Sequence, residues 1–182
     1  MQIHETANAP NDATGILRQV ESKYGFVPNL LGVMAGAPPL LRAYLAVTEL
    51  FDSTSLSPVE RQVVLLAASR ENECDYCMAA HSAIADMQQL PADVIEAIRD
   101  DREIADGKLE SLRRFTAETV RTRGWPSDST RAQFFEAGYT EASALEVILG
   151  IGMKTLSNYT NHLAETPLDG QFEGRRWTAA NG

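Results

Sequence analysis

The amino-acid sequence predicts an all-α fold. Apolar residues recur at three- and four-residue spacings over most of the 182-residue chain, which gives a helix one apolar face. No stretch alternates apolar and polar residues for long enough to predict a β-strand. Apolar residues make up 44% of the chain and charged residues 23%, a composition typical of a globular protein with its own core. We therefore expect one helical domain over residues 1–182, with residues 1–12 and 167–182 as peripheral segments.

The first third of the chain predicts three short helices. Glycine and proline residues at 25–28 and 36–39 separate them, because both residue types interrupt helices. The expected helices cover residues 14–24, 30–35 and 39–52.

The clearest helix start lies at Ser57. Ser57 is a favourable N-cap, Pro58 suits the first helical position, and Glu60 can complete a capping box. Val, Leu and Ala dominate residues 62–70, so this helix is expected to be buried on nearly all sides.

The next helix is expected to carry both cysteines of the chain. Asn72 can serve as its N-cap, with Asp75 at the third position. This arrangement puts Cys74 in the first turn and lets the helix continue to Ala85.

Four further helices are expected in the second half, over residues 91–98, 109–123, 130–137 and 140–163. The last of them has an apolar stripe made of Leu145, Ile148, Leu149, Gly152, Met153, Leu156 and Tyr159. Residues 167–182 are expected to be extended, with Phe172 and Trp177 docked on the core.

Charge and hydropathy exclude several classes of partner. The net charge is −9 and the isoelectric point is near 4.8, so the surface repels a phosphate backbone and nucleic acid is not an expected partner. No run approaches the roughly 18 apolar residues that a membrane helix needs. The first residues lack the basic and apolar regions of a secretory signal. We therefore expect a cytoplasmic protein with no membrane partner.

The chemistry of the sequence is concentrated in one short motif. Cys74, Cys77 and His81 form a C-x-x-C-x-x-x-H pattern. Cys77 and His81 are four residues apart and share a helix face, and an imidazole near a thiol favours the reactive thiolate. Two cysteines at this spacing can also close a disulfide with little backbone movement.

Three interpretations of this motif are open. The cysteines could be inert apolar residues, or Cys74, Cys77 and His81 could supply three ligands to zinc, with His4 and His162 remote in sequence. The third interpretation, a dithiol that cycles between thiol and disulfide, is favoured in a reducing compartment. Cys77, one turn from His81, is then the attacking thiolate, and Cys74, expected to be more exposed, is the resolving thiol. No metal or cofactor is expected.

The segments 56–62 and 74–82 resemble the carboxymuconolactone decarboxylase superfamily, most closely its AhpD-like alkylhydroperoxidase branch. The core of this resemblance covers about residues 56–90, and a weaker likeness extends over 158–169. The resemblance implies an AhpD-like helical bundle that assembles as a homo-oligomer, such as a dimer, trimer or hexamer. It also implies a thiol-dependent peroxidase that reduces hydroperoxides, with Cys77 attacking and Cys74 resolving. Electrons would come from a thiol reductant, such as a lipoylated or thioredoxin-like protein.

The chain departs from the family pattern around the histidine. In the family the histidine, here His81, forms a proton relay with a glutamate twelve residues before the first cysteine, and that position is Gln62 here. Gln62 can bond to His81 but cannot take up a proton, which predicts a less basic imidazole. Glu60 is a second candidate for the relay, although it lies about 200° from Gln62 around the helix and has a role in the capping box.

Two more side chains are candidates for the site. Tyr76 stands where the type members of the family have a histidine, and its phenol can donate a hydrogen bond to a thiolate but is a poor proton shuttle near neutral pH. His162 is expected either to line a pocket near the thiols or to stabilise the end of the last helix.

The favoured function is therefore a thiol-dependent peroxidase with a dithiol–disulfide cycle. One alternative is a dithiol–disulfide oxidoreductase or redox-sensing binding protein without efficient peroxidase turnover. A less favoured alternative is a decarboxylase of muconolactone-like ring acids, because such enzymes do not depend on a C-x-x-C pair.

Overall fold

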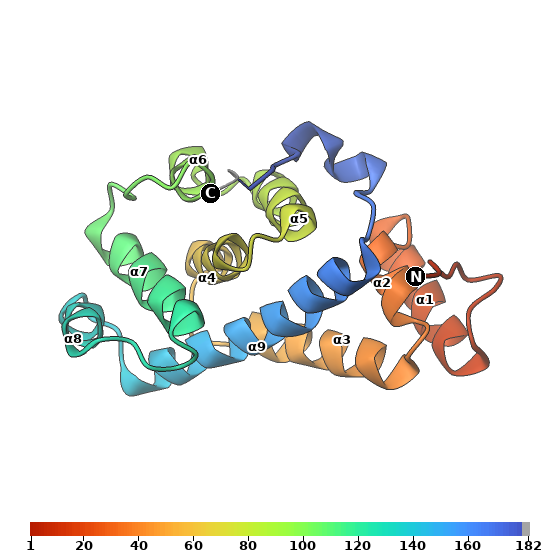
Figure 1. The fold of residues 1–182 in the computed structure, drawn as a ribbon, viewed down its shortest axis with the longest axis horizontal. Coiled ribbons are helices and arrows are strands. Elements are labelled where there is room, and N and C mark those ends of the chain that lie inside the picture. Colours follow the sequence, from red (N-terminus) through yellow and green to blue (C-terminus); the bar gives the residue numbers. More distant parts are fainter. Residues whose placement is uncertain (180–182) are drawn as a thin grey trace.

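The computed structural model describes residues 1–179, and within them every regular element is a helix (Figure 1), which confirms the predicted fold class. The elements are α1 (Asn11–Tyr24), α2 (Asn29–Met34), α3 (Pro38–Asp52), α4 (Pro58–Glu71), α5 (Asp75–Met87), α6 (Ala92–Arg99), α7 (Gly107–Arg121), α8 (Asp128–Glu136), α9 (Glu141–Ala164) and the 3-10 helix η1 (Gly170–Arg175).

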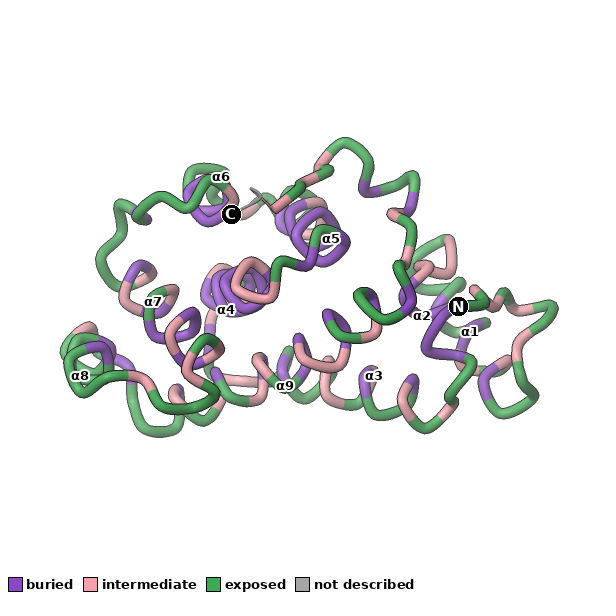
Figure 2. Tube along the Cα trace, in the orientation of Figure 1, coloured by how far each residue is buried: buried purple, intermediate pink, exposed green. Residues whose placement is uncertain are grey.

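Helix α4 is the centre of the fold. It packs against α5, α6, α7 and α9, and most of its residues are buried (purple in Figure 2). All residues from Gln62 to Ser69 are buried, as the sequence predicts, and the Ser57–Glu60 capping box is present at its start. Because it has almost no exposed face, α4 fixes the positions of the helices around it.

Long helix α9 crosses α4 and lies beside α3 (Figure 1). Gly150 makes this close approach possible, because a Cβ atom there would lie 2.7 Å from both Phe51 of α3 and Val64 of α4. The contacted atoms belong to the rigid ring of Phe51 and to the short, branched side chain of Val64, which cannot move aside. Any larger residue at position 150 would therefore force the helices apart.

The connection from α4 to α5 places the cysteines. The sequence predicts that Asn72 begins α5, and this prediction is wrong, because Asn72 instead ends α4. Glu73 then adopts a left-handed conformation with φ 53°, and its N–H donates to Arg70 while the N–H of Cys74 donates to Ser69. This is a Schellman turn, and it makes Cys74 the N-cap of α5 rather than a residue of its first turn.

The C-terminal segment is not extended throughout, because residues 170–175 form η1. Phe172 is buried and meets Tyr76 edge to face, and the indole of Trp177 donates to the carbonyl of Arg99. Both predicted anchors therefore dock on the core. Residues 180–182 of the predicted extended tail lie outside the described residues.

Helix α9 carries its polar side chains inward. Its buried positions include Lys154, Ser157, Asn158 and Asn161. Much of the apolar stripe seen in the sequence faces outward instead, with Leu145, Ile148 and Tyr159 exposed. Neither α9 nor any other helix within residues 1–179 is long and apolar enough to cross a membrane. Because buried polar groups need partners, their gathering on the inner side of α9 indicates a functional site there.

Candidate functional site

The two cysteines lie at the start of α5 and are both reduced. Cys74 is the N-cap and Cys77 the third residue of the helix, where the helix dipole favours a negative charge. The side chains are 1% and 2% exposed, respectively. The expectation that Cys74 is the more exposed thiol is therefore wrong, because the Schellman turn directs it into the core.

The two thiols have pKa values shifted in opposite directions. Burial alone raises the pKa of Cys77, but a hydrogen bond from Cys74 and the charge of Lys154 outweigh it and bring that pKa well below the ordinary value. The hydrogen bond to Cys77 raises the pKa of Cys74, and burial raises it further. Cys77 is thus the more acidic of the two thiols and the one that more readily becomes a thiolate.

Asn161 of α9 supports the same assignment. Its amide Nδ2 donates to the sulfur of Cys77 at 3.3 Å and approaches the sulfur of Cys74 at 3.8 Å. An amide N–H has no lone pair to accept a thiol proton, so this contact favours a sulfur that acts as an acceptor. The amide Oδ1 of Asn161 is buried and has no hydrogen-bond partner within residues 1–179.

Lys154 is the group that sequence reasoning missed. It has no exposed surface, and its Nζ lies 2.9 Å from Nε2 of His81. The signal was present, because Lys154, Asn158 and Asn161 recur at helical spacing among apolar residues. In the sequence, the apolar stripe of this helix suggests that the apolar side faces the core and that Lys154 faces the solvent. Only the packing of α9 shows that its polar side faces inward.

His81 bonds to the lysine rather than to a sulfur. Because an ammonium can only donate, Nε2 of His81 accepts from Lys154, and the proton on Nδ1 then points to Oε1 of Gln62 at 3.2 Å. Burial, and then the charge of Lys154, lower the pKa of His81 well below its usual value. The imidazole is therefore neutral because of its burial and the neighbouring charge, and within residues 1–179 its ring nitrogens bond to Lys154 and Gln62 rather than to a sulfur.

Glu60 has its partners elsewhere. Its carboxylate accepts from the backbone of Ser57 at 2.8 Å and from the hydroxyl of Tyr139 at 3.0 Å, and it pairs with Lys108 at 3.1 Å. Within residues 1–179 it makes no hydrogen bond to His81. The structure thus gives Glu60 the capping role and does not place it in the relay, because it leaves α4 on a different side from Gln62.

These contacts make Glu60 a pH-dependent stabilising group. Although burial opposes ionisation, hydrogen bonds from Ser57, Lys108 and Tyr139 lower its pKa from 4.5 to about 2. A group whose pKa falls on folding stabilises the fold above its unfolded pKa, and this contribution is lost as the pH falls through the folded pKa. We expect Glu60→Gln to unfold more easily than the wild type at pH 7, and the difference in free energy of unfolding to shrink below about pH 4.5 and vanish near pH 2. Urea titrations across this range measure it, and a pH-independent difference would contradict the assignment.

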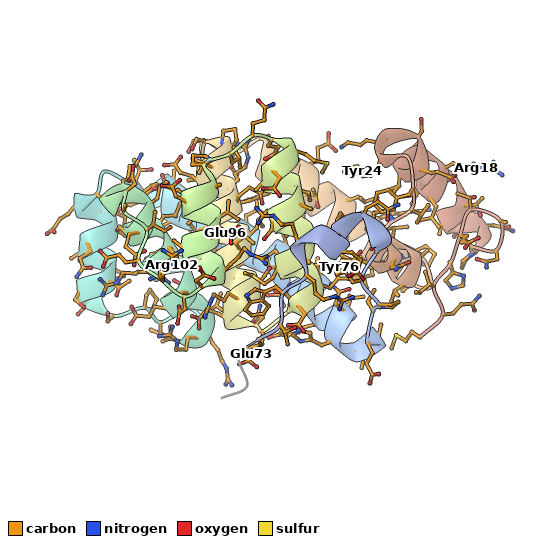
Figure 3. The ribbon with its side chains drawn as sticks, turned by 90° about the horizontal axis from the view of Figure 1, so that it is seen from above. Arg18, Tyr24, Glu73, Tyr76, Glu96 and Arg102 are labelled. Atoms are coloured by element: carbon orange, nitrogen blue, oxygen red, sulfur yellow. The ribbon has the colours of Figure 1, made fainter. Side chains whose placement is uncertain are left out.

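Tyr76 and His162 have roles other than those expected. The hydroxyl of Tyr76, a residue labelled in Figure 3, donates to Asp169 at 2.5 Å and accepts from the backbone of Leu30. It is therefore not free to bond a thiolate. His162 is exposed in the last turn of α9, where it does not line the thiol site. Neighbouring Asp75 accepts from the backbone of Ala179. The two residues between the cysteines therefore hold the C-terminal segment in place.

Within residues 1–179, no group of three His, Cys, Asp or Glu side chains is arranged to hold a metal ion. His81, the third member of the motif, has both ring nitrogens engaged by Lys154 and Gln62. What the residues do form is a buried pair of reduced cysteines with a buried lysine nearby on α9.

Comparison with known proteins finds a family model that matches part of the chain. Residues 38–118 match the model of the carboxymuconolactone decarboxylase family, and this range contains α4, α5 and both cysteines. No curated protein matches the chain in sequence.

Solved structures agree over nearly the whole chain. An uncharacterised peroxidase-related protein from Ralstonia eutropha JMP134, with an alkylhydroperoxidase AhpD core, is 22% identical with a TM-score of 0.83, covering 94% of this chain and 93% of that protein. A peroxidase-related protein from Silicibacter sp. TM1040 is 19% identical with a TM-score of 0.80, over 93% and 92% of the two chains. The debrominase Bmp8 is 16% identical with a TM-score of 0.80, over 96% and 94%. Residues 38–118 are thus similar to the carboxymuconolactone decarboxylase family, and the chain as a whole has an AhpD-like helical fold.

Proposed function

We propose that this protein is a thiol-dependent peroxidase of the AhpD-like type. The observation that carries the proposal is the asymmetry of the dithiol: the pKa of Cys77 is lowered and that of Cys74 is raised within one buried pair. A thiolate with a protonated thiol at its side is the arrangement that two-step reduction of a peroxide requires.

The proposed cycle begins with attack by the Cys77 thiolate on the peroxide. The sulfur takes the outer oxygen, the O–O bond breaks, and an alcohol leaves, so that Cys77 becomes a sulfenic acid. Cys74 then attacks Cys77, water leaves, and a Cys74–Cys77 disulfide remains. A thiol reductant, such as a lipoylated or thioredoxin-like protein, returns the disulfide to the dithiol.

The surroundings of the sulfurs support a hydroperoxide as substrate. The unpartnered Oδ1 of Asn161 offers an acceptor for the O–H of a hydroperoxide, on the same amide that donates to Cys77. Asn158, on the same helix, is fully buried, and its Nδ2 has no partner among residues 1–179. Buried polar groups without partners are costly, so groups of this kind are expected where a ligand completes them.

The exposed face of α9 supports the expected homo-oligomer. Leu145, Ile148, Tyr159 and Leu163 are between 48% and 74% exposed along this one helix. A row of exposed apolar side chains of this kind favours association with another surface. We therefore propose that the protein assembles as a homo-oligomer.

Peroxide consumption tests the proposed function. We expect stopped-flow mixing with hydrogen peroxide and with an organic hydroperoxide to oxidise the reduced protein far faster than free cysteine at the same pH. Rates equal to those of free cysteine with both peroxides, together with rapid disulfide exchange with a dithiol protein, would instead support an oxidoreductase or redox sensor. Turnover of a muconolactone-like acid that survives loss of both cysteines would support a decarboxylase.

A further inference from the structure

Lys154 is the least expected side chain in the core. It has no exposed surface, and within residues 1–179 no carboxylate forms an ion pair with it. Buried lysines are rare, because the ammonium loses its hydration on burial and needs a partner that compensates. Packing alone does not explain a lysine at this position, since a methionine would fill similar space without that cost.

Two groups surround the ammonium. Its Nζ donates to Nε2 of His81 at 2.9 Å, and the ring is held in this orientation by Gln62 on its other nitrogen. The second group is the sulfur of Cys77, which lies one helical turn before His81 on α5 and is contacted at 3.3 Å by Asn161, two turns after Lys154 on the same inner face of α9. The charge of Lys154 lowers the pKa of this thiol. His81 therefore fixes the direction of the ammonium, and Cys77 supplies the negative charge that balances it.

We propose that Lys154 is a catalytic residue of the dithiol site, acting as the counter-ion of the Cys77 thiolate and as the proton donor to the oxygen that leaves when the peroxide bond breaks. The proton-donor role rests on the proposed peroxidase function. The counter-ion role does not, since it applies to any reaction of the Cys77 thiolate.

The first step balances with Lys154 as the acid. The electron pair of the Cys77 thiolate forms an S–O bond to the outer oxygen of the hydroperoxide, and the O–O bond breaks. The departing oxygen takes that bond's electron pair and one proton from the Lys154 ammonium, and it leaves as an alcohol. The products are a Cys77 sulfenic acid and a neutral lysine, so both buried charges disappear together.

The second step balances with Lys154 as a base and then as an acid. Its amine takes the proton of the Cys74 thiol, the Cys74 sulfur attacks Cys77, and the S–O bond breaks. The departing hydroxide takes a proton back from Lys154 and leaves as water. The neutral amine that remains needs no counter-ion beside the disulfide. An external dithiol then supplies two electrons and two protons, one to Cys74 and one to Lys154.

Among residues 1–179, Lys154 is the group near Cys77 that can take this role. The titratable groups that interact with Cys77 or Lys154 within residues 1–179 are Cys74, Tyr44, Tyr76 and His81. Burial raises the pKa of Tyr44 and of Tyr76, so both phenols stay neutral, and burial lowers that of His81, so the imidazole stays neutral too. Lys154 is the cation beside this set.

Replacing Lys154 in a Cys74→Ser background, where Cys77 is the remaining thiol, tests both roles. Lys154→Met removes the charge, and Lys154→Gln removes it while keeping a donor for His81. We expect the pH midpoint for alkylation of Cys77 by iodoacetamide to rise in both, to at least the ordinary cysteine value of about 8.5. Lys23→Met, a change at an exposed lysine of α1, is the matched control and should leave the midpoint unchanged.

Comparison of two reagents separates the two roles. Iodide leaves without a proton, so above the midpoint the alkylation rate should match that of the background protein. At the same pH, the rate with hydrogen peroxide should remain at least about 100-fold below that of the background protein, because the acid is missing. A 100-fold loss with peroxide alone would support the proton-donor role.

Each contrary result has a distinct meaning. An unchanged alkylation midpoint in a folded Lys154→Gln protein, checked by circular dichroism, overturns the counter-ion role. An unchanged plateau rate with hydrogen peroxide overturns the proton-donor role. If the parent protein reacts with peroxide no faster than free cysteine but its midpoint still depends on Lys154, the proposed function fails and the counter-ion role stands.

Discussion

Cys77→Ser is expected to abolish the rapid reaction with peroxide, leaving a rate at or below that of free cysteine. The serine hydroxyl does not ionise near neutral pH, so the nucleophile is lost even though the side chain fits the same space. We expect a loss of at least 100-fold in the second-order rate with hydrogen peroxide, measured by stopped flow at pH 7.

Cys74→Ser is the matched variant, because it changes the same atom on the neighbouring thiol. We expect it to retain a single rapid oxidation, since its hydroxyl can still donate to the Cys77 thiolate, but to stop at the sulfenic acid. Trapping by a sulfenic-acid reagent should label Cys77 in this protein. Equal losses of the first oxidation in the two variants would contradict the division of roles, and loss in Cys74→Ser alone would reverse it.

Phe134→Ala is expected to cause the largest loss of stability among single changes outside the site. Phe134 of α8 has no exposed surface and stacks between Phe115 at 4.1 Å and Tyr139 at 4.6 Å between ring centroids. Its removal leaves a cavity between α7 and α8, and such truncations cost about 3–5 kcal/mol. Urea titration at fixed protein concentration measures the loss in free energy of unfolding.

The adjacent residue provides the control for this prediction. Phe135 is 41% exposed and meets Phe134 only edge to face, so Phe135→Ala should cost about 1 kcal/mol or less. Since α8 lies away from the cysteines and packs on α7, the Phe134→Ala protein, while folded, should keep the peroxide rate of the wild type. Equal costs for the two changes would show that α8 is not docked through Phe134.

The fold was predictable because local signals agree with the tertiary structure. The Ser57–Glu60 capping box, the prolines at helix starts and the glycines after helix ends act over a few residues, and the helices form where they predict. Where the sequence prediction failed, the cause is tertiary. Asn72 is an equally good residue for a helix start or a helix end, and only the left-handed Glu73 decides between them.

The site was only partly predictable. The spacing of Cys74 and Cys77 identifies the dithiol, and Gln62 does bond to His81 as the sequence suggests. The cation of the site could not be predicted in this way, because Lys154 lies 77 residues after Cys77 in a helix whose sequence is mainly apolar. Its part in the site depends on which side of α9 faces α5, and a pattern with an exposed apolar stripe suggests the wrong side.

Intact-mass spectrometry of the reduced protein, before and after one equivalent of hydrogen peroxide, tests the central claim most directly. The account predicts a loss of about two mass units, reversed by a dithiol reductant, because two hydrogens leave when Cys74 and Cys77 join. Peptide mapping should find that link. An unchanged mass, or the gain of one oxygen with both cysteines still separate, would contradict a dithiol that closes on itself.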